Sequence, residues 1–196
     1  MSYRNIALMG KARSGKDEVG KYLTANFAFT RVAFADPLKG MALSLDPIIG
    51  AESGHYGYLP NRLSDIVRRY GWEKAKDRYP EIRRTLQRLG QTVRVNDADY
   101  WVNIAMDKVD VADTWNLPVV VTDVRYPNEA DALRARGFLL ARVQRPAAEH
   151  LTLTQAGAAT HESETALDDY PADVTLANVG TLPQLHLDAS QLVTRR

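Results

Sequence analysis

The sequence predicts an α/β protein with a mostly parallel sheet of five strands between layers of helices. Short apolar segments alternate with segments of helical spacing, and this alternation is typical of parallel sheets. One apolar segment, residues 117–123 (LPVVVTD), is rich in Val, as expected for a central strand that is buried on both faces. The other expected strands are 4–9, 29–34, 138–144 and 172–176.

The helices expected between these strands begin and end at ordinary signals. An Asp-Pro pair at residues 36–37 starts one helix, and Gly137 ends another. Residues 45–60 contain Pro, Gly and Ser and are expected to form a loop. Apart from the helix at residue 36, the expected helices are 17–25, 61–70, 81–93, 100–111, 127–136 and 184–193.

We expect these elements to form a single domain with three parts. The core takes in about residues 1–45 and 112–196, and a helical region of about 46–111 is inserted into it. Within the second core segment, about residues 145–165 have weak apolar periodicity and are expected to form a small lid. No internal repeat or linker divides the chain.

The composition excludes several classes of protein. Of 196 residues, 45% are apolar and 25% are charged, which argues against disordered and collagen-like chains. No apolar run approaches about 20 residues, so we expect no membrane span. The absence of Cys excludes thiol catalysis and fits a reducing compartment, so we expect a cytoplasmic protein. With a net charge of +1, neither nucleic acid nor a membrane is an expected partner.

Residues 10–18 (GKARSGKDE) contain the spacing of a phosphate-binding loop. Gly10, Gly15 and Lys16 match G-x-x-x-x-G-K between an expected strand and an expected helix. In such a loop, consecutive backbone N–H groups point at phosphate oxygens, and the lysine reaches the β and γ phosphates. An ordinary Gly-rich turn with a solvated lysine is the alternative. The residues expected to bind ATP are Gly10, Lys11, Ala12, Arg13, Ser14, Gly15, Lys16, Asp17 and Glu18.

Two carboxylates are candidates for a magnesium site. Asp123 ends the buried strand VVVTD, which is how the second loop of such ATPases presents an acid to magnesium or its waters. Asp17 stands where the phosphate-binding loop normally carries Ser or Thr, and a carboxylate is an equally suitable ligand for a hard cation. Alternatively, Asp17 only favours the positive end of its helix.

Candidates for binding a phosphate acceptor follow the second strand and lie on a later helix. Asp36 and Lys39 come just after the strand at 29–34, at the edge of the sheet where ligands of open α/β folds bind. A helix cap and a solvated lysine are the alternatives.

The later helix has two faces. Ile82, Leu86, Leu89 and Val93 form an apolar face, and Arg83, Gln87, Gly90 and Arg94 form a second face beside it. Guanidinium groups suit phosphate, an amide can read a base edge, and Gly lets a ligand approach the backbone. Residues 62–94 hold ten basic side chains against four acidic ones. A solvated arginine-rich helix is the alternative.

Arginines near the expected strand ends are candidates for catalysis. Arg125 follows Asp123 and could offset charge on the transferring phosphoryl group. A structural ion pair with Glu129 or Asp131 is the competing explanation. Arg142 and Arg145 flank the end of the next strand, where a closing lid would exclude water. The segment HESE (161–164) is not expected to be a metal cluster, because no matching His or Cys pair exists elsewhere.

Together these segments resemble the bacteriophage deoxynucleoside monophosphate kinases. The family commonly carries GKD in its phosphate-binding loop, which makes Asp17 consistent with a working site. This chain departs from the family at Glu18, where Thr is more usual. Whether magnesium binding lacks the hydroxyl group of that Thr is left open by the sequence. The segments that carry the resemblance are, in order, GKARSGKD, FADPLK, LQRLGQTVR, WV (101–102), VVTDVRYPNEAD and HESE.

The resemblance implies a three-layer P-loop kinase with a helical acceptor-binding insertion and a lid. It implies ATP and Mg²⁺ as co-substrates, and transfer of the γ-phosphoryl group to a deoxynucleoside monophosphate (dNMP) to give dNDP for DNA synthesis. It also implies a bacteriophage origin and action in a bacterial cytoplasm. The catalytic residues would be Lys16, Arg125 and Arg145. The acceptor-binding residues would be Asp36, Lys39, Arg83, Gln87, Arg94, Arg125 and Glu164.

Other functions compete with this interpretation. A phosphomevalonate kinase has a similar SGKD loop, but it needs no amide to read a base, so Gln87 discriminates between the two. A nucleic-acid-binding P-loop ATPase would use the basic segment 62–94 on a phosphate backbone. A non-catalytic module would bind ATP without forming ADP. The accepted bases, the choice between deoxy and ribo forms, and a homodimer are left open by the sequence.

Overall fold

The chain divides into two compact units in the computed structural model, which describes residues 3–146, 162 and 165–195. Unit 1 comprises Met1–Phe34 and Val102–Arg196, and unit 2 comprises Ala35–Trp101. The expected parts of the domain, with boundaries near residues 45 and 112, stay a prediction, and the two units have other bounds in both places. The helix after the second strand belongs to unit 2, and most of the helix that begins at Tyr100 belongs to unit 1.

Unit 1 contains the expected parallel five-stranded sheet. Its strand order is β2-β5-β1-β6-β7, and each pair of neighbours is parallel. The order puts β1, the strand before the phosphate-binding loop, at the centre of the sheet. The strands are β1 (Ile6–Met9), β2 (Thr30–Val32), β5 (Val119–Val124), β6 (Leu139–Gln144) and β7 (Val174–Ala177).

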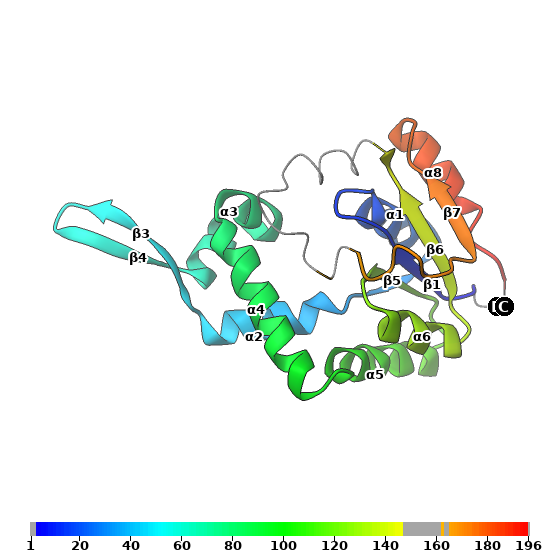
Figure 1. The fold of residues 1–196 in the computed structure, drawn as a ribbon. Helices are drawn as coiled ribbons and strands as arrows, with labels where there is room; N and C mark the ends of the chain where they lie inside the picture. The colour runs from blue at the N-terminus through cyan, green and yellow to red at the C-terminus, as the bar shows by residue number, and fades with distance from the viewer. Residues whose placement is uncertain (1–2, 147–161, 163–164, 196) are drawn as a thin grey trace. The chain divides into compact units, whose positions relative to one another are not determined.

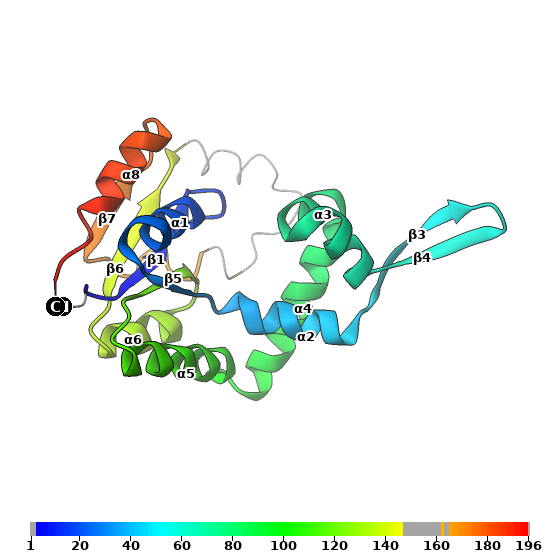
Figure 2. The ribbon, with the colours of Figure 1, turned by 180° about the vertical axis from the view of Figure 1, so that it is seen from behind.

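Helices cover both faces of this sheet and give the three expected layers. Figures 1 and 2 show α1 and α8 on one face and α5 and α6 on the other. The side chains of β1 alternate accordingly: Ile6 and Leu8 pack in the α1–α8 core, and Ala7 and Met9 pack in the other. The helices are α1 (Lys16–Phe27), α5 (Tyr100–Thr114), α6 (Pro127–Ala135) and α8 (Leu182–Ser190).

The strand register brings three chain segments to one edge of the sheet. Met9, the last residue of β1, is paired with Val124 of β5 and with Arg142 of β6. Because these strands are parallel, the segments that follow them begin side by side. The glycine loop, the acidic end of β5 and the arginine after β6 are thereby placed at one edge.

Unit 2 is built from α2 (Ala35–Leu45), α3 (Leu63–Arg78) and α4 (Pro80–Asn96) around a small core of its own. The expected apolar face of α4 is confirmed, because Ile82 is fully buried and the Leu residues of that face pack against the same core. The helix expected to end at residue 70 is confirmed at that end, because Gly71, with a φ of 71° and a ψ of 162°, is not helical. A second helical segment, which was not predicted, follows Gly71 and completes α3.

The prediction of a loop at residues 45–60 was wrong, because the segment forms an antiparallel hairpin. Strands β3 (Ile48–Gly54) and β4 (Gly57–Arg62) are joined by a two-residue turn. Most side chains of both strands are exposed, so the sequence lacks the alternation that burial of one face would impose. Figure 1 shows this hairpin, in cyan, extending beyond the helices of unit 2.

No helix within the described part of the chain is long and apolar enough to span a bilayer.

Candidate functional site

The loop between β1 and α1 has the backbone path of a phosphate-binding loop. Gly10 has a φ of 139°, and a Cβ on it would lie 2.2 Å from the carbonyl oxygen of Val143. Gly15 has a φ of 110° and precedes α1 without any side-chain cap on the helix. Residues with a Cβ rarely adopt such φ values, so both glycines are needed for this path. The expected sequence of strand, glycine loop and helix is confirmed.

Lys16 folds back over this loop. Its side chain is almost buried, with 8% of the residue exposed. The Nζ atom donates to the carbonyl oxygens of Gly10 at 2.6 Å and Lys11 at 2.7 Å. The ammonium is therefore held at the loop itself, where a phosphate cradled by the loop would meet it. A solvated lysine is not what the structure shows.

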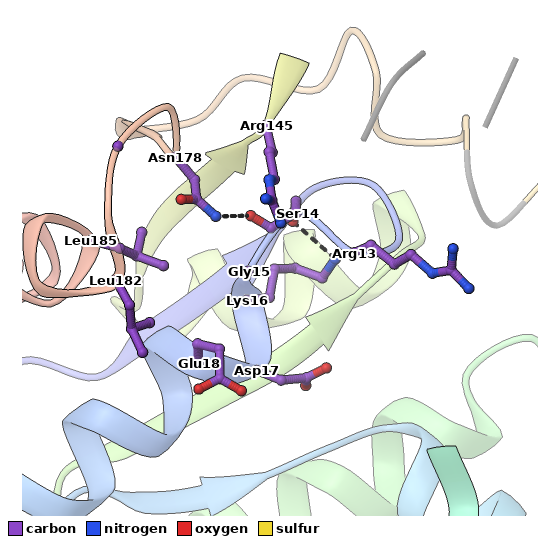
Figure 3. A pocket seen from close by; sticks show the side chains of 11 residues that line it. Arg13, Ser14, Gly15, Lys16, Asp17, Glu18, Arg145, Asn178, Leu182 and Leu185 are labelled. Atoms are coloured by element: carbon purple, nitrogen blue, oxygen red, sulfur yellow. Dashed lines mark hydrogen bonds between the residues drawn. The ribbon is translucent and has the colours of Figure 1, made fainter. Parts of the chain in front are cut away.

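A cavity of about 340 Å³ opens beside the loop. Figure 3 shows its polar wall, formed by the loop and the first turn of α1, and Leu182 and Leu185 opposite. An apolar wall with a few polar groups is typical of small-molecule sites, whose volumes start at about 300 Å³. The lining residues are Arg13, Ser14, Gly15, Lys16, Asp17, Glu18, Arg145, Asn178, Gly180, Leu182 and Leu185.

The segment 178–185 was missed by the sequence predictions. It comprises the connection after β7 and the first turn of α8, and the two leucines of that turn supply the apolar part of the cavity wall. A signal was available, since the strand expected at 172–176 had to end at the same edge as the other parallel strands. Its carboxyl end was therefore a candidate position for ligand contacts.

Two arginines line the cavity from different directions. Arg145 follows β6, and Arg13 lies in the glycine loop with a φ of 61°. Both side chains are exposed, and Figure 3 shows Arg145 beside Ser14 of the loop, whereas the Arg13 side chain extends away from Leu182 and Leu185. The cavity thus combines an apolar wall with cationic groups, as an anionic ligand with an apolar part requires.

The two candidate metal ligands lie in unit 1. Asp123 is half-buried at the end of β5, and its Oδ1 accepts a hydrogen bond from the backbone N–H of Phe34 at 2.9 Å. Asp17 is exposed in the first turn of α1 and lines the cavity. Carboxylate oxygens are ligands that magnesium prefers, so the donor chemistry fits.

Within the described ranges, no group of three or more acidic, His or Cys side chains could hold a metal ion. A magnesium ion at Asp17 and Asp123 would therefore complete its shell with phosphate oxygens or water, which is its usual mode of binding. His161 and Glu164, two members of the HESE segment, lie outside the described residues.

The backbone of Arg125 is fixed by a buried carboxylate. Glu129 is 1% exposed, and its Oε2 accepts the N–H groups of Arg125 at 2.8 Å and Tyr126 at 3.2 Å. Asp131, the other acid considered as a partner of Arg125, accepts the hydroxyl of Tyr170 at 2.6 Å. Glu129 thus caps the start of α6 and holds the turn that carries the arginine.

The segment after the expected lid is attached to the sheet. Arg142 donates from Nη2 to the carbonyl oxygens of Leu167 at 2.9 Å and Tyr170 at 2.5 Å. Burial, together with the hydrogen bond to Asp131, raises the pKa of Tyr170, which keeps its hydroxyl a donor. Lys11 of the loop forms an ion pair with Asp168. Arg142 supports this segment, whereas most of the expected lid, including Glu164, lies outside the described residues.

Unit 2 holds the other acceptor-binding candidates. Asp36 and Lys39 form an ion pair at 3.7 Å on α2, and the Lys39 ammonium lies 5.8 Å from the ring centre of Trp72. On α4, Arg83 donates to Asp77 at 2.6 Å and to the carbonyl oxygen of Lys76 at 3.2 Å. These contacts tie both cations to neighbouring helices of the unit.

The remaining residues of the polar α4 face differ in their surroundings. Gln87 is exposed, and Arg94 is half-buried. Gly90 is buried: a Cβ on it would lie 3.2 Å from Leu38 of α2, and its carbonyl oxygen accepts the Trp101 Nε1–H at 3.4 Å. The gap expected at Gly90 for a ligand is thus filled by the packing of α2 against α4.

Comparison with known proteins identifies a family to which this sequence is similar. The family model described as deoxynucleotide monophosphate kinase matches residues 64–188, which is more than half of the chain. The match includes Arg83, Asp123, Arg125 and Arg145, and it begins after the phosphate-binding loop.

Three relatives are similar to this sequence over at least half of its length. The deoxynucleotide monophosphate kinase of Enterobacteria phage T4 is 30% identical over 161 residues, which are 81% of this chain and 60% of the relative. A putative deoxynucleotide monophosphate kinase of Acanthamoeba polyphaga mimivirus is 28% identical over 96% of this chain and 94% of the relative. An uncharacterized protein of Ictalurid herpesvirus 1 is 36% identical over 53% of this chain and 44% of the relative. The chain thus spans less than two thirds of the phage T4 and herpesvirus relatives.

Proposed function

The chain belongs to the deoxynucleotide monophosphate kinase family, and from this premise we propose that it transfers the γ-phosphoryl group of ATP to a dNMP. The observation that carries the proposal is the position of Lys16, whose ammonium lies on the glycine loop beside an apolar-walled cavity. Such an arrangement suits a ligand with an apolar base at one end and phosphates at the other. The product would be a deoxynucleoside diphosphate.

The donor nucleotide would occupy the cavity of unit 1. Leu182 and Leu185 offer the base an apolar surface, and the loop N–H groups with Lys16 would hold the phosphates. Arg13 and Arg145 line the same cavity and supply further positive charge. Because the charge of a transferring phosphoryl group is spread over its oxygens, positioning and cations provide most of the catalysis.

Arg125 and Arg145 would offset the charge of the transferring group. Both follow strands that end at the phosphate-loop edge of the sheet, and Glu129 fixes the backbone N–H of Arg125. A guanidinium placed at the developing charge lowers the barrier because it stabilises the transition state more than the bound substrate.

Asp17 and Asp123 would hold magnesium, which when bound neutralises phosphate charge and fixes the orientation of the phosphates. Replacing Asp17 with Ala is expected to raise the magnesium concentration for half-maximal rate about ten- to a hundredfold, whether the carboxylate binds the ion or one of its waters. Initial rates over a magnesium titration measure this. Unchanged magnesium dependence with a small loss of stability would instead assign Asp17 to the helix terminus.

The dNMP would be bound by side chains of unit 2, with Arg83 and Arg94 for its phosphate and Gln87 for its base. Replacing Gln87 with Ala is expected to raise KM for the preferred dNMP about tenfold and to change the ranking of bases, because the variant loses a base-edge hydrogen bond. Gln91 is the matched control, since it is an exposed amide of the same helix. An unchanged ranking in Gln87→Ala would remove Gln87 from base recognition.

One assay tests the proposed function as a whole. ADP release from ATP and magnesium is measured with dAMP, dGMP, dCMP, dTMP, their ribo forms and phosphomevalonate, each offered separately. The proposal requires release with at least one dNMP. Release with phosphomevalonate alone, or ATP hydrolysis stimulated only by DNA, would assign a different function. The viral sources of the relatives support a role in viral DNA synthesis, inside the infected cell.

A further inference from the structure

Asn178 connects the two halves of the cavity wall. It follows β7, and its backbone N–H donates to the carbonyl oxygen of Gln144 at 2.7 Å, which continues the pairing of β6 with β7. Its side-chain Nδ2 donates to the carbonyl oxygen of Ser14 in the glycine loop at 2.8 Å. Figure 3 shows the amide reaching from the segment before α8 to the loop. Residues 164 positions apart are thus joined by one hydrogen bond.

The absence of a side chain at Gly15 makes this hydrogen bond possible. A Cβ on Gly15 would lie 2.6 Å from Nδ2 of Asn178 and 3.3 Å from Cδ2 of Leu185. The second glycine of the loop therefore has two roles. It permits a φ of 110°, and it leaves room for the Asn178 amide against the loop backbone.

The hydrogen bond fixes the orientation of one peptide unit. The peptide between Ser14 and Gly15 is trans, so its C=O and N–H point in opposite directions. With the Ser14 oxygen held toward Asn178, the Gly15 N–H points away from Asn178. A phosphate-binding loop depends on such N–H groups being oriented before the ligand arrives, because reorientation on binding costs affinity.

We propose that Asn178 is a positioning residue that holds the Gly15 N–H ready for phosphate, and that it thereby determines donor-phosphate affinity. This inference rests on the proposed function, since it concerns the donor phosphates of that same site. Asn178 acts through the Ser14–Gly15 peptide and needs no contact with the phosphates themselves. Neither a glycine-loop motif nor a strand pattern points to it, because the contact exists only in the folded chain.

The test compares two variants, Asn178→Ala and Asn178→Asp. The second keeps the shape of the side chain, but an ionised carboxylate cannot donate to the Ser14 oxygen. The probe is inorganic tripolyphosphate, whose binding is measured by calorimetry. We expect its Kd, and the KM for ATP, to rise about three- to tenfold in both variants, as for the loss of one hydrogen bond. The KM for the dNMP is expected to be unchanged.

Asn26→Ala is the matched control. Asn26 also donates from Nδ2 to a backbone carbonyl, that of Tyr22 at 2.9 Å, but it lies near the far end of α1. A general loss of stability would affect all variants, whereas the inference requires the change in phosphate affinity in the Asn178 variants only. A second measurement is the NMR chemical shift of the Gly15 backbone amide in ligand-free protein. We expect this chemical shift to change in Asn178→Asp and to stay the same in Asn26→Ala.

The outcomes separate this inference from the proposed function. Wild-type protein that binds neither tripolyphosphate nor ATP would contradict the proposed function, and the Gly15 resonance would still test whether Asn178 orients the peptide. Wild-type binding with equal affinity in both Asn178 variants would overturn the inference and leave the kinase proposal standing. An unmoved Gly15 resonance in Asn178→Asp would overturn it as well.

Discussion

Replacing Lys16 with Met is expected to lower kcat for ADP formation about a hundred- to a thousandfold, the usual cost of removing one donor to transition-state charge. Met keeps most of the apolar stem of the nearly buried lysine but has no ammonium. The carbonyl oxygens of Gly10 and Lys11 also lose their Lys16 donor. Steady-state ADP release with a saturating dNMP measures the effect.

Lys21→Met is the control for Lys16→Met. Lys21 lies in the same helix, but it is exposed and pairs with Glu18 at 2.6 Å, so its loss is expected to change kcat by less than about twofold. Circular dichroism of both variants establishes that α1 is intact. Near-normal kcat in Lys16→Met would contradict the role of the loop in phosphoryl transfer and favour an ordinary Gly-rich turn.

The parallel sheet was predictable because its signals are local. The buried strand at 117–123 contains a run of three Val residues, and β1, β2, β5 and β7 are each followed by a helix. The hairpin at Ile48–Arg62 gave no such signal, since its side chains are mostly exposed and no buried face imposes alternation. The break at Gly71 was predicted, whereas the helical segment that continues α3 from Gly71 to Arg78 was not.

The candidate site was predictable where a single motif carries the chemistry. Lys16 follows from the spacing of the glycine loop, and Asp123 follows from an acid at the end of a buried strand. Asn178 and Gly90 depend on contacts between segments far apart in sequence. Gly90 looked like an opening for a ligand, whereas Leu38 fills it. Composition and periodicity describe which residues share a face, but not what packs against that face.

Replacing Gly10 with Ala is expected to lower the free energy of unfolding by about 2 to 5 kcal/mol, from backbone strain and overpacking together. The added methyl would meet the Val143 carbonyl oxygen at 2.2 Å, and that oxygen belongs to strand β6 of the central sheet. A φ of 139° adds strain even if the strand shifts. Chemical denaturation measures the change, and the Kd for tripolyphosphate is expected to rise with it.

Gly40→Ala gives the opposite expectation and serves as the control for Gly10→Ala. Gly40 lies inside α2, is exposed, and a Cβ on it would meet nothing within 4 Å. The substitution is expected to raise the free energy of unfolding by about 0.5 to 1 kcal/mol, because Ala favours a helix interior more than Gly does. If Gly10→Ala were as stable as wild type and bound tripolyphosphate equally well, the loop could not pass Val143 as closely as it does here. The first glycine would then be required neither by the loop path nor by the sheet beside it.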